Sequence, residues 1–207
     1  MRPIPSKERR WLGWLACALS AALGLGLWVF WVLPVRASVA DATPGPSGTS
    51  VSVRLEEGQR VGIWASGRAA MLGTLECTVR SAGGEEPAVQ RVRDLSWNDT
   101  LWWVTPRAGF ESYAGFGAGA TGEYAVSCDD SIGGYEASYL LAKDPQAPGW
   151  IGLGRGGSAD FRSSSVLAYG AVVAPLLAVL LLPIMGVQSL RARHRRRQNS
   201  ASSSTGS

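Results

Sequence analysis

The sequence of 207 residues contains a single histidine, His194, which stands in the arginine-rich run RARHRRR. Triad-type hydrolases use a histidine as general base, and catalytic zinc sites commonly use histidine ligands. The middle of the chain therefore has no Ser-His-Asp set, no Cys-His set and no histidine-ligated zinc site. The sequence predicts a protein that is not an enzyme and that has no catalytic residue, cofactor or bound metal.

Carboxylates and glycines occur in clusters that lack the spacing of known sites. Calcium takes about six or more oxygen ligands, and Asp129–Asp130 with Glu136 has no D-x-D-x-D-G loop around it, so an acidic turn is predicted. Neighbouring residues on a strand point to opposite faces, which argues that Glu56–Glu57 and Glu85–Glu86 are turn residues and not the paired carboxylates of a hydrolase. The run Gly152–Gly157 matches GxGxxG without the preceding strand and following helix of a dinucleotide site.

Charged residues are absent from two long stretches, Trp11–Leu33 and Val166–Leu190. A helix needs about 20 apolar residues to cross a hydrocarbon core of about 30 Å, and it satisfies its own backbone hydrogen bonds in lipid. We therefore expect transmembrane helices at residues 11–33 and 166–190. Pro175 and Pro183 are tolerated in such a helix but should kink it.

The basic residues are concentrated at the two ends. Residues 1–10 carry a net charge of +3 and five arginines follow residue 190, whereas residues 37–163 contain 10 basic and 15 acidic residues. Lysine and arginine accumulate on the cytoplasmic side of membrane proteins. This pattern predicts two cytoplasmic termini, an extracytoplasmic middle region, and the lipid bilayer, not nucleic acid, as a partner. The topology signal lies in Arg9, Arg10, Arg191, Arg193, Arg195, Arg196 and Arg197.

The first uncharged stretch has two interpretations, a cleaved signal peptide and an uncleaved anchor. A signal peptide has an apolar centre of about 7–15 residues and a small-residue cleavage site, and Ser38-Val39-Ala40 would serve as that site. The stretch at residues 11–33 is longer and has tryptophans at both ends, which favours an anchor that remains in the mature protein. Under both interpretations the chain crosses the membrane outwards here.

Small residues recur every four positions in both stretches, a spacing that lets helix backbones approach closely. We expect the two helices to pack on each other or on a second copy of the chain. Alanine and glycine are abundant in the sequence, so chance is the alternative explanation of this pattern. The two stripes are Ala18, Ala22 and Gly26, and Gly170, Ala174 and Ala178.

The region between the helices divides by composition. Residues 34–50 are a proline-containing linker, residues 146–165 a Gly/Ser-rich tether, and residues 191–207 a basic, disordered cytoplasmic tail. Residues 51–145 alternate apolar and polar side chains in short runs separated by turn residues, which predicts an all-β sandwich. Strands are expected around 51–55, 61–65, 75–79, 89–92, 95–104, 110–116, 124–128 and 139–141.

Tryptophans distinguish the core of this domain from its surface. On a strand over residues 95–104, Trp97 and Trp103 would share one face and enter the core. Trp102 would point to the opposite face, and Trp102 and Trp64 are the candidates for exposed aromatic side chains. Tryptophan is enriched at binding hot spots, so these two are candidates for contact with a protein partner.

Two of the three cysteines, Cys77 and Cys128, lie on the apolar faces of predicted strands. An even pair of cysteines in an exported domain predicts a disulfide, and two buried thiols are the alternative. Cys17 lies inside the first uncharged stretch.

The segment TGEYAVSC, residues 121–128, contains the pattern Gly-x-Tyr-x-x-x-Cys. It resembles the closing strand of immunoglobulin-like and pre-peptidase C-terminal-like β-sandwiches. The whole chain resembles small bacterial membrane proteins that carry such an exported domain between two transmembrane helices. In the immunoglobulin tyrosine corner the tyrosine lies two residues before the cysteine, whereas Tyr124 lies four before Cys128, so the strand order does not follow from the resemblance.

Together these features predict a membrane-anchored protein of the cell envelope with a non-enzymatic binding or scaffold domain outside the cytoplasm. The expected partners are the bilayer and another envelope protein. The alternative function is a sensor or regulatory subunit that relays an external signal through the paired helices to the basic tail.

Overall fold

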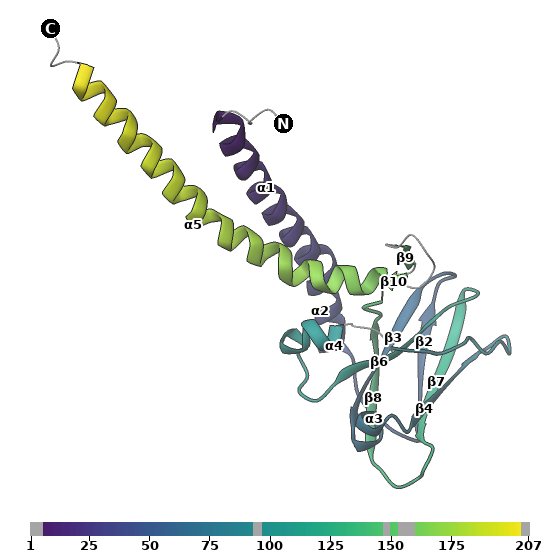
Figure 1. Ribbon diagram of the computed structural model, residues 1–207. Helices are drawn as coiled ribbons and strands as arrows, with labels where there is room; N and C mark the ends of the chain where they lie inside the picture. Colours follow the sequence, from purple (N-terminus) through teal and green to yellow (C-terminus); the bar gives the residue numbers. More distant parts are fainter. Residues whose placement is uncertain (1–5, 93–96, 147–149, 153–159, 204–207) are drawn as a thin grey trace. The chain divides into compact units, whose positions relative to one another are not determined.

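The computed structural model describes residues 6–92, 97–146, 150–152 and 160–203 (Figure 1), and it describes the side chains of residues 11–92, 97–146 and 165–191. The chain divides into two compact units. A helical unit contains residues 1–27 and 170–207, and a strand-rich unit contains residues 28–169.

The helical unit is formed by α1 (Ser6–Leu27) and most of α5 (Ser163–Ser203). The two helices meet through glycines of α1. A Cβ atom at Gly13 would lie 2.6 Å from the sulfur of Met185, and one at Gly24 would lie 3.0 Å from Cδ of Pro175. Between these points Cys17 is buried, with its sulfur 3.7 Å from the Ala178 carbonyl oxygen. Glycine therefore permits the close approach of the two backbones.

The predicted small-residue stripes lie at different places in this unit. On α5, Ala174 and Ala178 are buried, whereas on α1 both Ala18 and Ala22 are exposed. Helical geometry explains the difference, because at 3.6 residues per turn Ala18 lies about 140° around the helix from Gly13. Two further stripe residues are intermediate in exposure, Gly26 and Gly170.

Helical structure extends beyond both predicted segments. After α1 the chain continues through a π-helix, η1 (Trp28–Val32), into α2 (Leu33–Asp41), so the first part of the predicted linker, residues 34–41, is helix. Pro34 is compatible with helix at this position, because the first turn needs no proline N–H. Helix α5 likewise continues to Ser203, where a disordered tail was expected, and arginine is a good helix former.

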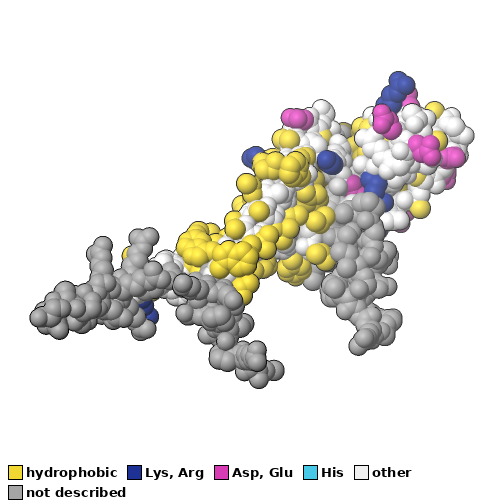
Figure 2. Space-filling view, turned by 90° about the horizontal axis from the view of Figure 1, so that it is seen from above, with side chains coloured by type: hydrophobic (Ala, Val, Ile, Leu, Met, Phe, Trp, Pro, Cys, Tyr) yellow, Lys and Arg dark blue, Asp and Glu magenta, His cyan; other side chains and the backbone are white. Residues whose placement is uncertain are grey.

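Among the described residues, two helices are long and apolar enough to cross a membrane, Trp11–Asp41 and Ser165–Arg191. They flank the strand-rich unit in the sequence. Hydrophobic side chains predominate on their described surface, whereas most charged side chains in view belong to the strands and loops (Figure 2).

The strand-rich unit has two antiparallel sheets, with strand orders β1-β8-β3-β6-β5 and β2-β7-β4. A separate pair, β9 and β10, lies within the predicted tether. The strands are β1 (Gly45–Pro46), β2 (Ser50–Leu55), β3 (Arg60–Gly67), β4 (Leu75–Ser81), β5 (Gln90–Arg91), β6 (Glu111–Gly117), β7 (Gly122–Asp130), β8 (Ala137–Lys143), β9 (Trp150–Gly152) and β10 (Asp160–Arg162). The short helices are α3 (Arg68–Leu72), α4 (Trp97–Thr100) and η2 (Trp102–Val104), the last of them a 3-10 helix.

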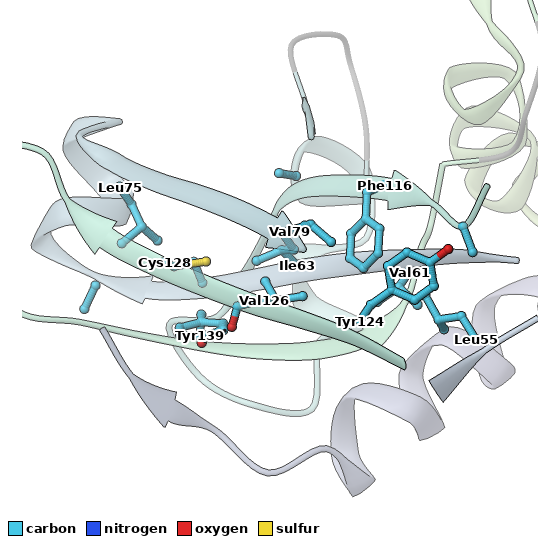
Figure 3. Packing of buried hydrophobic residues seen from close by; sticks show 14 of the residues in the cluster. Leu55, Val61, Ile63, Leu75, Val79, Phe116, Tyr124, Val126, Cys128 and Tyr139 are labelled. Atoms are coloured by element: carbon cyan, nitrogen blue, oxygen red, sulfur yellow. Dashed lines mark hydrogen bonds between the residues drawn. The ribbon is translucent and has the colours of Figure 1, made fainter. Parts of the chain in front are cut away.

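Both sheets contribute to one hydrophobic core (Figure 3). From β3 the residues Val61 and Ile63 enter this core, and from β7 the residues Tyr124 and Val126 do so. Alternation along the strands places these side chains on one face, as the sequence pattern predicted. Tyr124 also donates a hydrogen bond of 2.7 Å from its hydroxyl to the Ala120 carbonyl, the type of contact that a tyrosine corner makes.

Cys77 and Cys128 form a disulfide. They are direct partners in the register of β4 and β7, two neighbouring strands of one sheet. The bond is therefore within a sheet, unlike the bond between sheets in antibody domains.

The outer face of the five-stranded sheet is also covered, and this changes the tryptophan assignment. Trp64 is fully buried, although the sequence predicted exposure, because it packs on Trp97 of α4 with ring centroids 5.8 Å apart. Residues 97–104 form α4 and η2 instead of a strand. The core prediction is correct for Trp97 but wrong for Trp103, which is 57% exposed, and the exposure predicted for Trp102 is found at 68%.

Candidate functional site: a groove beside helix α2

A groove of about 740 Å³ lies in the strand-rich unit, where β2, the start of β3 and the end of β8 meet the residues of η1 and α2. Its walls are apolar, with Val53 and Leu141 from the strands and Trp31 from η1. Its charged lining consists of three basic residues, Arg54, Arg60 and Lys143, and one acidic residue, Asp144. The groove therefore combines an apolar wall with an excess of positive charge.

Asp144 fixes one of the basic residues. Its side chain is only 2% exposed, and its Oδ2 accepts a hydrogen bond of 2.9 Å from Nε of Arg60. The Gln146 backbone N–H donates to Oδ1 at 2.8 Å. A Cβ atom at Gly115 would lie 2.9 Å from Oδ2, so the carboxylate occupies space that only glycine leaves open. Such a charge is stable in the interior because it is paired and hydrogen-bonded.

Replacement of Arg60 by methionine should lower the free energy of unfolding by about 3 kcal/mol, because it removes the ion pair between Arg60 and the buried carboxylate of Asp144. Urea denaturation followed by circular dichroism measures the loss. The matched control is Arg80→Met, since the Arg80–Glu86 pair is 76% and 70% exposed and such a pair contributes about 0–1 kcal/mol. Equal losses in the two variants would show that burial of Asp144 has no special effect.

Helix α2 forms one side of the groove because it packs on β8. Val35 and Val39 of α2 are fully buried, as is Val32 at the end of η1, and their i, i+3, i+7 spacing gives this run of helix one apolar face. Ser38 lies at the groove, and its Oγ accepts a hydrogen bond of 3.0 Å from the backbone N–H of Lys143. The wall of the groove and the end of the first apolar helix are therefore the same structure.

Arg107 holds the C-terminal end of α2. Its Nε donates to the Val39 carbonyl at 3.1 Å, and its Nη2 donates to the carbonyls of Ala40 and Ala42 at 3.0 and 2.6 Å. The last carbonyls of a helix lack intrahelical partners, and a cation is favourable at this end of the helix dipole. One side chain between α4 and β6 therefore fixes the helix end to the domain.

Three tryptophans connect η1 to the sheet. The rings of Trp31 and Trp97 are 5.5 Å apart in an edge arrangement, and Trp97 packs in the same way on Trp64. Edge-to-face aromatic pairs at this distance contribute about 0.5–1.5 kcal/mol beyond the area that they bury. The Trp97 indole N–H donates to the Thr105 hydroxyl at 3.0 Å.

The acidic turn predicted at Asp129–Asp130 begins one residue later, because these two residues are the last of β7 and pair with β4, and the turn itself is formed by residues 131–133. The Thr74 hydroxyl donates to Oδ1 of Asp130 at 2.6 Å, and the backbone N–H groups of Gly134 and Tyr135 donate to Oδ2, both at 2.9 Å. The Thr74 hydroxyl, together with these N–H groups, holds the pKa of the Asp130 carboxyl below its ordinary value. Within the described ranges, no group of three or more His, Cys, Asp or Glu residues is arranged to hold a metal ion.

Several predicted residues lie where the structure describes no side chain. These are the topology residues Arg9, Arg10, Arg193, Arg195, Arg196 and Arg197, whereas Arg191 is described and exposed. Most of the GxGxxG run, residues 153–157, lies outside the described residues. Sequence reasoning missed Arg60, Arg107 and Asp144, whose partners lie far away in the chain. No family model and no curated protein matches this sequence.

Proposed function

We propose that the chain is a two-pass membrane protein of the cell envelope, with both termini in the cytoplasm. In this proposal the two sheets form a β-sandwich outside the cytoplasm, as the resemblance to small bacterial membrane proteins implies. The domain is a non-enzymatic binding or scaffold module, and its groove beside α2 receives a segment of an envelope protein. The basic lining of the groove favours an acidic segment.

The observation that carries this proposal is the shared construction of the groove and the anchor. Trp31 and Ser38 line the groove, and both belong to the helix Trp11–Asp41 that is long and apolar enough to cross a membrane. A bound partner would thus be held directly beside the bilayer. The same construction argues for an uncleaved anchor, because cleavage after Ala40 would remove one side of the groove.

Photocrosslinking in intact cells tests the function. A photoreactive amino acid at Lys143, which lines the groove, should give a discrete adduct with an envelope protein. The matched control position is Ile132, which is 67% exposed in the loop before β8. Arg54→Glu, a charge reversal on the groove, should reduce the Lys143 adduct at least fivefold. Identical adducts at both positions, or a Lys143 adduct that is insensitive to Arg54→Glu, would refute the groove as the binding site.

A second candidate function is relay of an external signal. It is favoured by the unbroken run of helical residues from Ser6 to Asp41, whose last turn Arg107 fixes to the domain. In a relay, the basic tail would dock a cytoplasmic protein. Removal of residues 191–207 would then abolish the response of the cell to the external signal. A scaffold needs no tail for binding, so it would keep its Lys143 adduct after the same removal.

A further inference from the structure

The strand-rich unit exposes large apolar side chains in two segments that are distant in the sequence. In and just after η1, Val29, Phe30 and Leu33 are 45%, 81% and 45% exposed. In η2, Trp102 and Trp103 are 68% and 57% exposed. Singly exposed apolar residues are ordinary, but a cluster of large ones indicates a surface that contacts another phase or partner.

The two segments are in contact. The ring of Trp28, the first residue of η1, lies 5.8 Å from the ring of Trp103 at an interplanar angle of 41°. The indole N–H of Trp103 donates to the Thr100 carbonyl at 3.2 Å. The exposed side chains of η1 and η2 are thus linked through this aromatic pair.

The chemistry of the first segment identifies the occupant. Residues 28–33 are the last part of the uncharged stretch Trp11–Leu33, and exposed Arg36 follows after one helical turn. Tryptophan is enriched where hydrocarbon meets the lipid headgroups, and an arginine beyond it suits the phosphate level. The segment Leu101–Pro106, which contains η2, is also uncharged.

We propose that Trp102 and Trp103 insert into the membrane interface beside Trp28, so that the extracytoplasmic domain rests on the bilayer through η2. The occupant of this surface is lipid. The inference rests on the membrane span of the proposed function and adds a second contact to it, made by the domain itself. Contact of Trp103 with Trp28 places η2 at the depth where the apolar stretch ends.

Spin labelling of the full chain in phosphatidylcholine–phosphatidylglycerol nanodiscs tests the proposal. Single nitroxides are attached at Phe30→Cys, Trp102→Cys and Ile132→Cys in a Cys17→Ala background with the disulfide intact. Collision rates with oxygen, which concentrates in lipid, and with a water-soluble nickel chelate report the depth of each label. The ratio of oxygen to nickel collisions at position 102 should exceed that at position 132 at least threefold.

The three positions separate the possible failures. A lipid signal at position 30 with an aqueous signal at position 102 overturns the inference and leaves the proposed function intact. Aqueous signals at both positions overturn the membrane span as well. A label at position 102 that neither reagent reaches would place it under protein, which also overturns the inference.

Native tryptophan fluorescence tests the same contact without a cysteine variant that perturbs η2. Lipids brominated near the headgroup quench tryptophans at the interface. The native chain should show this interfacial quenching. The variant in which Trp102 and Trp103 are both replaced by phenylalanine should lose the part of the quenching that these two residues contribute. A double variant with unchanged interfacial quenching would contradict the proposal.

Discussion

A fragment that begins at Asp41, as cleavage after Ala40 would leave it, should be less stable than the fragment 28–146 by about 5 kcal/mol or more. It lacks Val32, Val35 and Val39, each of them fully buried, and complete burial of one such side chain contributes about 1.5–3 kcal/mol. It also lacks Trp31 and thereby one of the aromatic pairs with Trp97. Urea denaturation of the fragments 28–146 and 41–146 measures the difference.

Two point variants of the longer fragment control for the effect of length alone. Val35→Ser removes a buried side chain of α2, whereas Leu33→Ser changes a neighbour that is 45% exposed. The first should lower the free energy of unfolding by about 2–3 kcal/mol and the second by less than about 1 kcal/mol. If the fragment 41–146 is as stable as 28–146, α2 is not part of the domain and a cleaved signal peptide becomes the better interpretation.

Joint replacement of Cys77 and Cys128 by alanine should lower the free energy of unfolding of the domain by about 4 kcal/mol. The bond joins residues 51 positions apart, and closing a loop of this length in the unfolded chain corresponds to about 4 kcal/mol in the chain-entropy model. Denaturation of the oxidised protein and of the double variant, each in the same detergent, measures the loss.

The third cysteine supplies the control for this prediction. Cys17→Ala alters the helical unit and should leave the unfolding transition of the strand-rich unit unchanged. Alkylation with mass spectrometry should label Cys17 alone after denaturation without reductant. Labelling of all three cysteines would show that the two strand cysteines are buried thiols, the alternative that the sequence left open.

The parts of the fold that were predicted correctly depend on patterns that repeat locally. Absence of charge over 23 residues is sufficient to predict a helix at Trp11–Leu33, because few other structures tolerate such a stretch. The alternation of apolar and polar side chains predicted β2, β3, β4 and β7, because side chains alternate in this way along a strand with one buried face. Cys77 and Cys128 both occupy apolar positions of predicted strands, and for this reason the disulfide could be predicted from the sequence.

The strand prediction is wrong over the described residues 97–104, where Trp97 and Trp103 were expected on one strand face, because these residues form two short helical turns instead. Tertiary contact of Trp97 with Trp31 and Trp64 favours the helical conformation of this segment, and that contact cannot be predicted from a local sequence pattern. The run from the end of η1 into α2 did carry a signal, the helical spacing of its three buried valines, which the proline at residue 34 obscured.

The groove could not be assembled from the sequence. Arg60 and Asp144 are 84 positions apart, and Arg107 reaches Ala42 across 65. Neither pair belongs to a motif. The pairing of β3 with β8 brings Arg60 and Asp144 together, and the packing of α2 on the domain brings Ala42 to Arg107. Only a correct strand order would have brought these side chains together.

The contact of α2 with β8 also constrains the order of events during biosynthesis. Ser38 meets Lys143 across 105 residues of chain, and translation at about 5–20 residues per second delivers that partner about 5–20 s later. Throughout this interval the apolar face of α2 has no sheet to cover it, and contacts between distant residues slow folding further. The domain can therefore complete its fold only after nearly all of it has been synthesised, so the first helix waits for β8 before its apolar face is covered.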